Sequence, residues 1–165
     1  MNTSGIIRKI DELGRIVLPK ELRRHLNINP GDDFQILLSE DKIILEKYSY
    51  LKSNEKDIVK VINGFIETSN DKILLIINNE IVNRNNDKIL PEIIQIINKR
   101  EIYRNNEIKN YKITNSVIEN GRILIYPLVL NSDLYGSLII VSIDNIEKAL
   151  EIAKTIDNII RQFYK

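Results

Sequence analysis

The sequence contains no cysteine and only one histidine, His25, in 165 residues. Without cysteine the chain can form neither disulfides nor thiolate metal sites, and one histidine cannot build a multi-histidine metal centre. Glycine-rich phosphate loops of the GxGxxG or GxxxxGK[ST] type are missing from the sequence as well. We therefore expect neither a metal nor another cofactor, and we assign no chemistry to His25.

Long apolar runs and a strong overall charge are also missing. No stretch approaches the roughly 18 uncharged apolar residues of a membrane helix, and the opening MNTSGII lacks the charged lead of a signal peptide. We therefore expect a cytoplasmic protein with no membrane partner. The net charge is only +1, so attraction to a polyanion has to come from local clusters of basic residues.

The stretch from Gly5 to Leu26 holds the most distinctive cluster of charge, with six basic residues against three acidic ones. The six are Arg8, Lys9, Arg15, Lys20, Arg23 and Arg24. Arginines on a short helix are more often solvated surface charges than ligands. Their clustering here leaves open the alternative, contact with the phosphates and base edges of DNA.

The N-terminal region reads as a compact β-β-α-β-β unit. Strands are expected at 5–10, 15–18, 34–38 and 42–47, with a helix that has Pro19 as its first residue. Gly14 and Gly31 supply the turns. Fewer than 50 residues bury too little surface to be comfortably stable alone, and no disulfide or metal can compensate. Size alone therefore predicts an intertwined homodimer whose two chains share one core.

The string GIIRKIDELGRIVLPKELRRHLNINPGD, closed by IILEKY, resembles the DNA-binding domain of the AbrB/SpoVT family of transition-state and sporulation regulators. This resemblance implies a swapped-hairpin β-barrel dimer over residues 1–50 that binds double-stranded DNA. It places the four DNA-contacting arginines of the family on Arg8, Arg15, Arg23 and Arg24, with Lys9 and Lys20 as auxiliary basic residues. Association with the nucleoid follows. His25 and Asn27 depart from the commoner residues after the arginine pair.

The C-terminal region, 54–165, predicts a second folded domain with helices and strands mixed. Helices are expected after a cap at Ser53 or Asn54, from Pro91, and after a cap-like pair formed by Asp144 and Glu147. Strands are expected at 72–77, near 111–114, at 122–130 and at 137–143, with 131–136 as a hairpin loop. Strand 72–77 is mostly apolar, which is typical of a strand covered on both faces.

The last predicted helix carries an apolar stripe with alternating spacings of three and four residues. Its members are Ile146, Ala149, Ala153, Ile156, Ile160 and Phe163. Two interpretations stay open. The stripe packs on the sheet of its own domain, or it forms an oligomerisation seam between protomers.

The order of these elements and the segment YPLVLNSDLYGSLIIVS resemble a GAF-like α/β sandwich, as found in the SpoVT subfamily. The fold class is therefore expected to be α+β, with this domain following the swapped-hairpin one. The resemblance implies a domain for sensing or oligomerisation. An unidentified small-molecule ligand and a homotetramer are both compatible with it, and so is a pure oligomerisation module.

The sequence bears on three classes of function. A DNA-binding transcriptional regulator fits the basic stretch and the resemblance. An antitoxin that represses its own promoter is the alternative, but such proteins usually carry a disordered, often acidic tail. Residues 49–165 instead have 16 basic and 15 acidic residues and the pattern of a folded domain. We expect no enzyme, because no carboxylate stands beside a nucleophile, a metal cluster or a phosphate loop.

Overall fold

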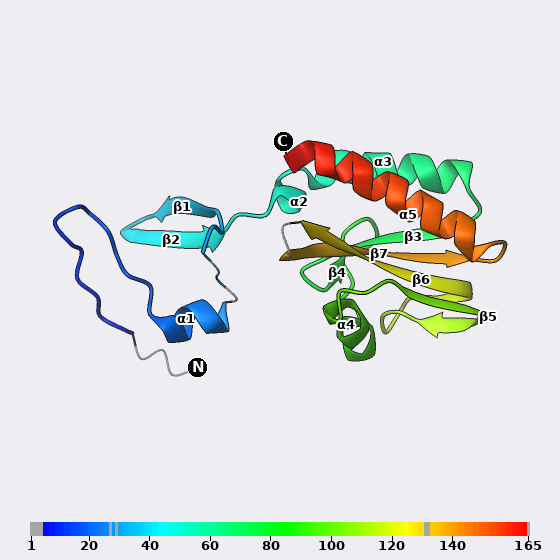
Figure 1. Cartoon of the computed structure of the whole chain (residues 1–165), viewed down its shortest axis with the longest axis horizontal. Coiled ribbons are helices and arrows are strands. Elements are labelled where there is room, and N and C mark those ends of the chain that lie inside the picture. The colour runs from blue at the N-terminus through cyan, green and yellow to red at the C-terminus, as the bar shows by residue number, and fades with distance from the viewer. Residues whose placement is uncertain (1–4, 27, 29, 131–132, 165) are drawn as a thin grey trace. The chain divides into compact units, whose positions relative to one another are not determined.

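The computed structural model describes residues 5–26, 28, 30–130 and 133–164. It divides into two compact units, Met1–Tyr48 (unit 1) and Ser49–Lys165 (unit 2). Figure 1 shows the elements of each unit. Asn27, Asn29 and the hairpin residues 131–132 lie outside the described residues. Among the described helices, none has the length and apolar character needed to cross a membrane.

Unit 1 contains a short helix and one hairpin. The helix is α1 (Lys20–His25), and the strands are β1 (Phe34–Ser39) and β2 (Lys42–Lys47), which pair antiparallel. Glu40 takes a φ of 50° at the tip. The predicted hairpin and its tip are therefore confirmed, because the alternation of apolar residues and the turn residues point to the same register.

Two local predictions in unit 1 are wrong. Residues 5–10 and 15–18 were expected to be strands, but they form none in the described chain, since a strand needs a neighbouring ladder. Only the turn between them is made: Gly14 N–H donates to the Asp11 carbonyl at 2.9 Å, with Gly14 at φ 76°. Pro19 lies one position before the helix with ψ 146°, an extended value, and not at its first residue.

Unit 1 has almost no apolar core of its own. Of its described residues only Pro19 is buried. Cross-strand pairing places four apolar side chains on one face of the β1–β2 hairpin. They are Ile36, Leu38, Ile43 and Leu45, all exposed in the single chain. A hairpin with an open apolar face is marginal in water, and a contiguous apolar surface of this kind is typical of an interaction site.

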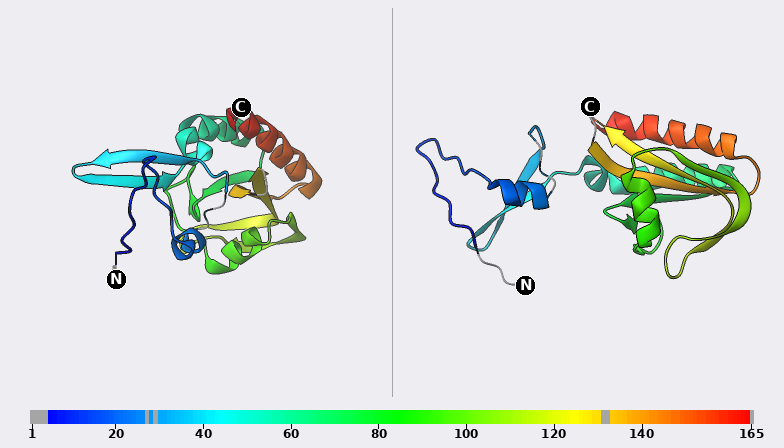
Figure 2. Two further views of the ribbon diagram at one scale, coloured as in Figure 1. Left: turned by 60° about the vertical axis from the view of Figure 1, so that its left-hand side comes forward. Right: turned by 60° about the horizontal axis from the view of Figure 1, so that its bottom comes forward.

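Unit 2 is a sandwich around a five-stranded antiparallel sheet of order β4-β3-β7-β6-β5. Its strands are β3 (Lys72–Ile77), β4 (Glu80–Ile81), β5 (Tyr103–Lys112), β6 (Ile118–Leu130) and β7 (Asp133–Ser142). Its helices are α2 (Tyr50–Ser53), α3 (Glu55–Thr68), α4 (Pro91–Asn98), α5 (Ile146–Ile160) and the 3-10 helix η1 (Arg161–Tyr164). The helices α3 and α5 cover one face of the sheet and α4 lies on the other (Figures 1 and 2).

Each face of the sheet has its own apolar layer, because successive strand residues point to opposite faces. Leu75 and Leu138 belong to the layer under α3 and α5, whereas Leu74 and Ile139 belong to the layer under α4. All residues of β3 from Ile73 to Ile77 are buried. The prediction of a strand covered on both faces is thus confirmed.

Three predictions in unit 2 need correction. The strand expected near 111–114 is in fact β5, which begins at Tyr103, because an exposed edge strand carries polar residues on both faces and shows no apolar alternation. β7 begins at Asp133, so the predicted hairpin loop is shorter than 131–136. The cap of α5 is Asn145, whose side chain accepts from Glu147 N–H at 2.8 Å, and not Asp144.

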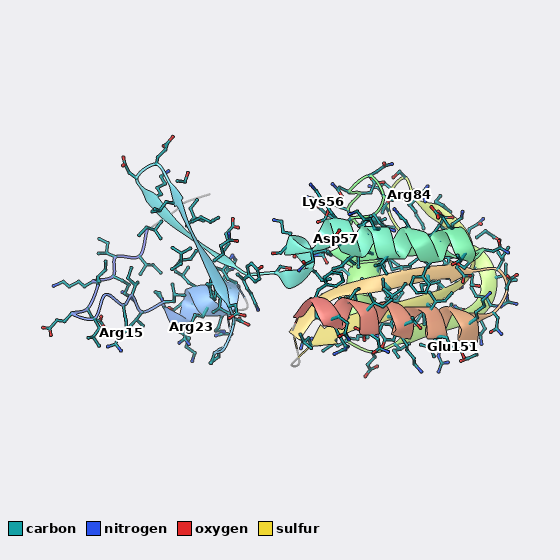
Figure 3. All side chains as sticks on the ribbon, turned by 90° about the horizontal axis from the view of Figure 1, so that it is seen from above. Arg15, Arg23, Lys56, Asp57, Arg84 and Glu151 are labelled. Atoms are coloured by element: carbon teal, nitrogen blue, oxygen red, sulfur yellow. The ribbon has the colours of Figure 1, made fainter. Side chains whose placement is uncertain are left out.

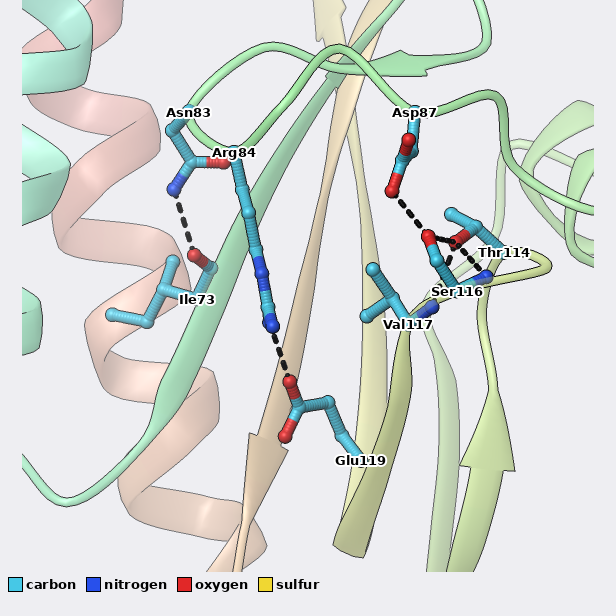
Figure 4. Close-up of polar contacts among 8 residues, drawn as sticks. All are labelled: Ile73, Asn83, Arg84, Asp87, Thr114, Ser116, Val117 and Glu119. Atoms are coloured by element: carbon cyan, nitrogen blue, oxygen red, sulfur yellow. Dashed lines mark hydrogen bonds and ion pairs between the residues drawn. The ribbon is translucent and has the colours of Figure 1, made fainter.

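The segment between β4 and α4 is fastened to the sheet by side chains (Figure 4). The Asn83 amide imitates a neighbouring strand: its oxygen accepts from Leu75 N–H at 2.9 Å and its nitrogen donates to the Ile73 carbonyl at 2.8 Å. Arg84 reaches Glu119 on β6 at 2.7 Å. The two Asn83 hydrogen bonds close the part of the β3 edge that the two-residue β4 leaves open, and the Arg84 pair ties the same segment to β6.

The apolar stripe of α5 packs on the sheet of its own unit. Ile146, Ala149, Ala153, Ile156 and Ile160 are buried in the layer under α3 and α5, and Phe163 in η1 packs against it. Of the two interpretations, the structure therefore supports packing within the chain. These six residues leave no open seam, so a contact between protomers through α5 would have to use its other, more exposed residues.

Candidate nucleic-acid interface

All six predicted DNA-binding residues are exposed and lie in unit 1. Arg8 and Lys9 belong to the segment before the turn, Arg15 follows the turn, and the helix carries the rest, namely Lys20, Arg23 and Arg24. Figure 3 shows Arg15 on the segment before α1 and Arg23 on α1 itself. The structure thus presents the six cations to solvent on a segment of fewer than 20 residues.

The helix α1 is short, and its ends determine how it displays its arginines. Pro19 precedes it, and the Pro19 carbonyl accepts the Arg23 N–H at 3.0 Å. Glu21 lies in the first turn, whereas Arg23 and Arg24 lie in the last, the arrangement that the helix dipole favours. Ile28 N–H donates to the Arg23 carbonyl at 2.7 Å and closes the C-terminal end.

The turn before α1 is organised by the Asp11 carboxylate. Its Oδ1 accepts the backbone N–H groups of Leu13 at 3.0 Å and Arg15 at 2.8 Å. Its Oδ2 accepts the Nε–H of Arg15 at 2.8 Å. The backbone and side-chain donors of Arg15, followed by the Leu13 N–H, lower the pKa of Asp11 below its usual value. Asp11 is therefore ionised at neutral pH.

The other cations of the stretch are available for an external anion. Among the described residues, no acidic side chain pairs with Lys9, Lys20, Arg23 or Arg24. Arg8 donates only to the neighbouring Ile7 carbonyl, at 3.1 Å. Across the part of the chain that the structure describes, no group of three or more metal-ligating side chains occurs. This arrangement suits binding of a polyanion without a metal.

Sequence reasoning placed the arginines but overlooked the acid that holds one of them. It treated Asp11 as a turn residue only. The signal was available, because an aspartate that opens a tight turn accepts backbone N–H groups two residues or more ahead. The turn also folds the chain back, so that Arg15, four residues after Asp11, reaches the same carboxylate. Asp11 is therefore an additional candidate functional residue.

The chain is similar to several known proteins. The family profile described as antidote-toxin recognition MazE, bacterial antitoxin, matches residues 7–53. Stage V sporulation protein T of Bacillus subtilis (strain 168) is 30% identical over 154 residues, covering 87% of this chain and 86% of that protein. The transition state regulatory protein AbrB of the same organism is 54% identical over 48 residues, which are 29% of this chain and 50% of AbrB.

A further relative, the putative transition state regulator Abh of Bacillus subtilis (strain 168), is also 54% identical over 48 residues, or 29% of this chain and 52% of Abh. The AbrB and Abh matches span less than a third of the chain, whereas the match to stage V sporulation protein T extends across both units. The chain therefore belongs to the AbrB/SpoVT family and is a DNA-binding transcription regulator of the AbrB type.

Proposed function

We propose that this regulator binds double-stranded DNA as a homodimer through the six basic residues of unit 1, and that unit 2 controls higher assembly. The observation that carries the proposal is the combination, in one small unit, of unpaired cations and uncovered apolar surface. In cells the protein would be found on the nucleoid in the cytoplasm.

The uncovered apolar surface of unit 1 supports the dimer. Leu38 is 83% exposed and Ile7 89% exposed in the single chain. Burying an isoleucine or leucine side chain contributes about 1.5–3 kcal/mol, so a shared core over both hairpins would stabilise the unit strongly.

The cations support DNA as the ligand of such a dimer. Four arginines per chain become eight, and if about six of them neutralise phosphates, the slope of log affinity against log salt would lie near −5. Arginine is suited to both phosphates and guanine edges because its donors form a planar fork. Shape and deformability of A·T-rich DNA would add to the discrimination.

For unit 2 we propose a role in joining dimers into tetramers and in binding a small regulatory molecule. The resemblance of its sandwich to GAF-like sensor domains supports this role. The stripe of α5 is not offered as the joining surface, because its own sheet covers it. The better candidates for the joining surface are half-buried apolar residues outside the stripe, such as Val59 on α3 and Ile159 on α5.

An antitoxin is the second candidate, and the match of the MazE profile to residues 7–53 favours it. That match lies almost wholly within unit 1. Unit 2 has two apolar layers and a five-stranded sheet, whereas a toxin-binding tail usually folds only on its partner. The folded second unit therefore weighs against toxin binding.

The test is a genome-wide DNA-binding profile of the full chain, beside a chain that ends at Tyr48 and two variants of the full chain. Arg23→Ala removes an unpaired cation of α1, and Lys154→Ala removes one exposed charge from α5 as a matched control. We expect enrichment to fall for Arg23→Ala and to stay unchanged for Lys154→Ala. Absence of enrichment for both the full and the shortened chain would contradict the proposal.

A further inference from the structure

The two oxygens of the Asp11 carboxylate perform different tasks. Oδ1 accepts two backbone N–H groups and thereby shapes the turn. Within the described residues, Oδ2 accepts the Nε–H of Arg15 at 2.8 Å and no second donor. A carboxylate needed for the turn alone would not require the second contact. The ion pair is therefore a separable feature of the site.

The ion pair leaves the two terminal nitrogens of the Arg15 guanidinium exposed. A guanidinium has five N–H donors in a rigid plane, and Asp11 uses the one on Nε. The four donors on the two terminal nitrogens stay available, and the side chain is 69% exposed. Fixing Nε to a carboxylate restricts the rotation of the plane, so these donors are aimed before any ligand arrives.

We propose that Asp11 is a positioning residue that aims Arg15 at a guanine edge and thereby gives the regulator sequence specificity. This inference rests on the proposed function, DNA binding by unit 1. The terminal nitrogens of Arg15 would donate end-on to O6 and N7 of guanine, a contact that depends on direction. A phosphate contact, by contrast, needs charge more than orientation.

The charge of Asp11 sharpens the argument. A carboxylate next to DNA repels phosphates and so lowers affinity for every sequence. Asp11 is ionised at neutral pH, and its lowered pKa keeps this charge in place into more acidic solution. If Arg15 only neutralised a phosphate, the charge of Asp11 would oppose binding, and a neutral asparagine could shape the turn as well. A charged residue at this place is useful only if the orientation of Arg15 matters.

The adjacent residue provides a matched control. Glu12 is exposed, lies in the same turn and has no ion pair with any described residue. Glu12→Gln and Asp11→Asn each remove one negative charge from the same place. Asp11→Asn keeps an Oδ1 acceptor for the turn but puts a donor where Oδ2 was, so it releases Nε. Asp11→Ser is a second variant. Its hydroxyl oxygen can still accept hydrogen bonds in the turn, but the side chain is too short to reach Nε of Arg15.

The experiment measures affinity for two duplexes by fluorescence anisotropy. One duplex is the site that the full-length wild type selects from a random DNA pool, and the other is its shuffled sequence. We expect Glu12→Gln to strengthen both affinities and leave their ratio unchanged. Asp11→Asn should strengthen binding to the shuffled duplex similarly. It should also lower the ratio of the affinity for the selected site to that for the shuffled duplex about fivefold or more, which corresponds to the weakest discrimination expected from one bidentate contact.

A double variant tests whether Asp11 acts through Arg15. Arg15→Lys keeps the charge but loses the planar fork, so its specificity ratio should be low. Adding Asp11→Asn to Arg15→Lys should lower the ratio no further. An additive loss would overturn the inference, and so would an Asp11→Asn variant that behaves like Glu12→Gln. Loss of the folded dimer in both Asp11→Asn and Asp11→Ser would overturn it too, by assigning Asp11 to the fold.

Failure of this inference is distinguishable from failure of the proposed function. If the wild type selects no duplex from the pool, DNA binding itself is contradicted. If the wild type selects a site and Arg15→Ala weakens binding to it, the proposed function stands. The Asp11 variants then decide the inference alone.

Discussion

The Arg161 side chain donates from Nη2 both to Oδ2 of Asp157, at 3.0 Å, and to the carbonyl of Val129, at 2.8 Å. Asp157 is 4% exposed and also accepts the hydroxyls of Tyr135 at 3.0 Å and Tyr126 at 3.3 Å. One buried carboxylate therefore joins the end of α5 and η1 to β6 and β7. A satisfied polar cluster of this kind fixes the position of the elements around it.

Replacing Asp157 by alanine should destabilise unit 2 by about 2–3 kcal/mol, because two tyrosine hydroxyls and one guanidinium lose their acceptor. The loss stays below that of a fully buried pair, since the Arg161 side chain is 37% exposed and can turn to water. Urea unfolding followed by circular dichroism measures it. Asp57→Ala, which breaks the exposed pair with Lys60, is the control and should change nothing measurable.

The same cluster predicts a fall in stability at alkaline pH. Burial, then the charge of Asp157 and the hydrogen bond to it, raise the pKa of Tyr126 above its ordinary value of 10.0. The folded state thus holds the tyrosine proton more tightly than the unfolded chain. This contribution is complete below pH 10.0 and is lost as the pH rises through the folded pKa. Tyr126→Phe should therefore reduce the decline in unfolding free energy above that pH; an unchanged slope would contradict it.

A charge on the open face of the hairpin should abolish the dimer of unit 1. Leu38 is 83% exposed in one chain, so Leu38→Asp would be harmless if that chain were the functional form. In a shared core it buries an unpaired carboxylate, which is costly. Sedimentation velocity should show monomers, and DNA binding should be lost. Ile143→Asp, at a position 53% exposed in unit 2, is the control; equal behaviour of the two variants would refute a shared core.

Two glycines of unit 2 should respond to alanine in opposite directions. At Gly136 a Cβ would lie 2.8 Å from the Ile76 carbonyl oxygen and 2.9 Å from Cδ1 of Leu51, so Gly136→Ala should cost about 1–3 kcal/mol. At Gly64, within α3, a Cβ would meet nothing within 4 Å. Gly64→Ala should therefore stabilise the unit by about 0.5–1 kcal/mol. Thermal unfolding of both variants checks the pair, and a stabilised Gly136→Ala would contradict the packing.

Prediction from sequence succeeded where a local pattern was strong. The β1–β2 hairpin, β3 and the helix beginning at Pro91 were all located correctly, since alternation, apolar runs and turn residues agree there. Prediction was incomplete at β5, because an edge strand with one neighbour and two solvent-exposed faces shows no alternation of apolar residues. The prediction of strands at 5–10 and 15–18 was wrong for a related reason. Strand pairing depends on two segments that lie side by side, whereas a sequence pattern describes only one segment at a time.

By itself, the sequence determined which residues avoid water and which carry charge, because those properties belong to single side chains. It thereby identified the basic stretch and the apolar stripe of the last helix. What covers an apolar surface is decided only by the tertiary structure, because the hydrophobic effect has no direction. The stripe packs on its own sheet, whereas the apolar face of the hairpin in unit 1 is exposed in the described chain. Likewise the turn alone brought Asp11 to Nε of Arg15, because a hydrogen bond depends on geometry that composition does not specify.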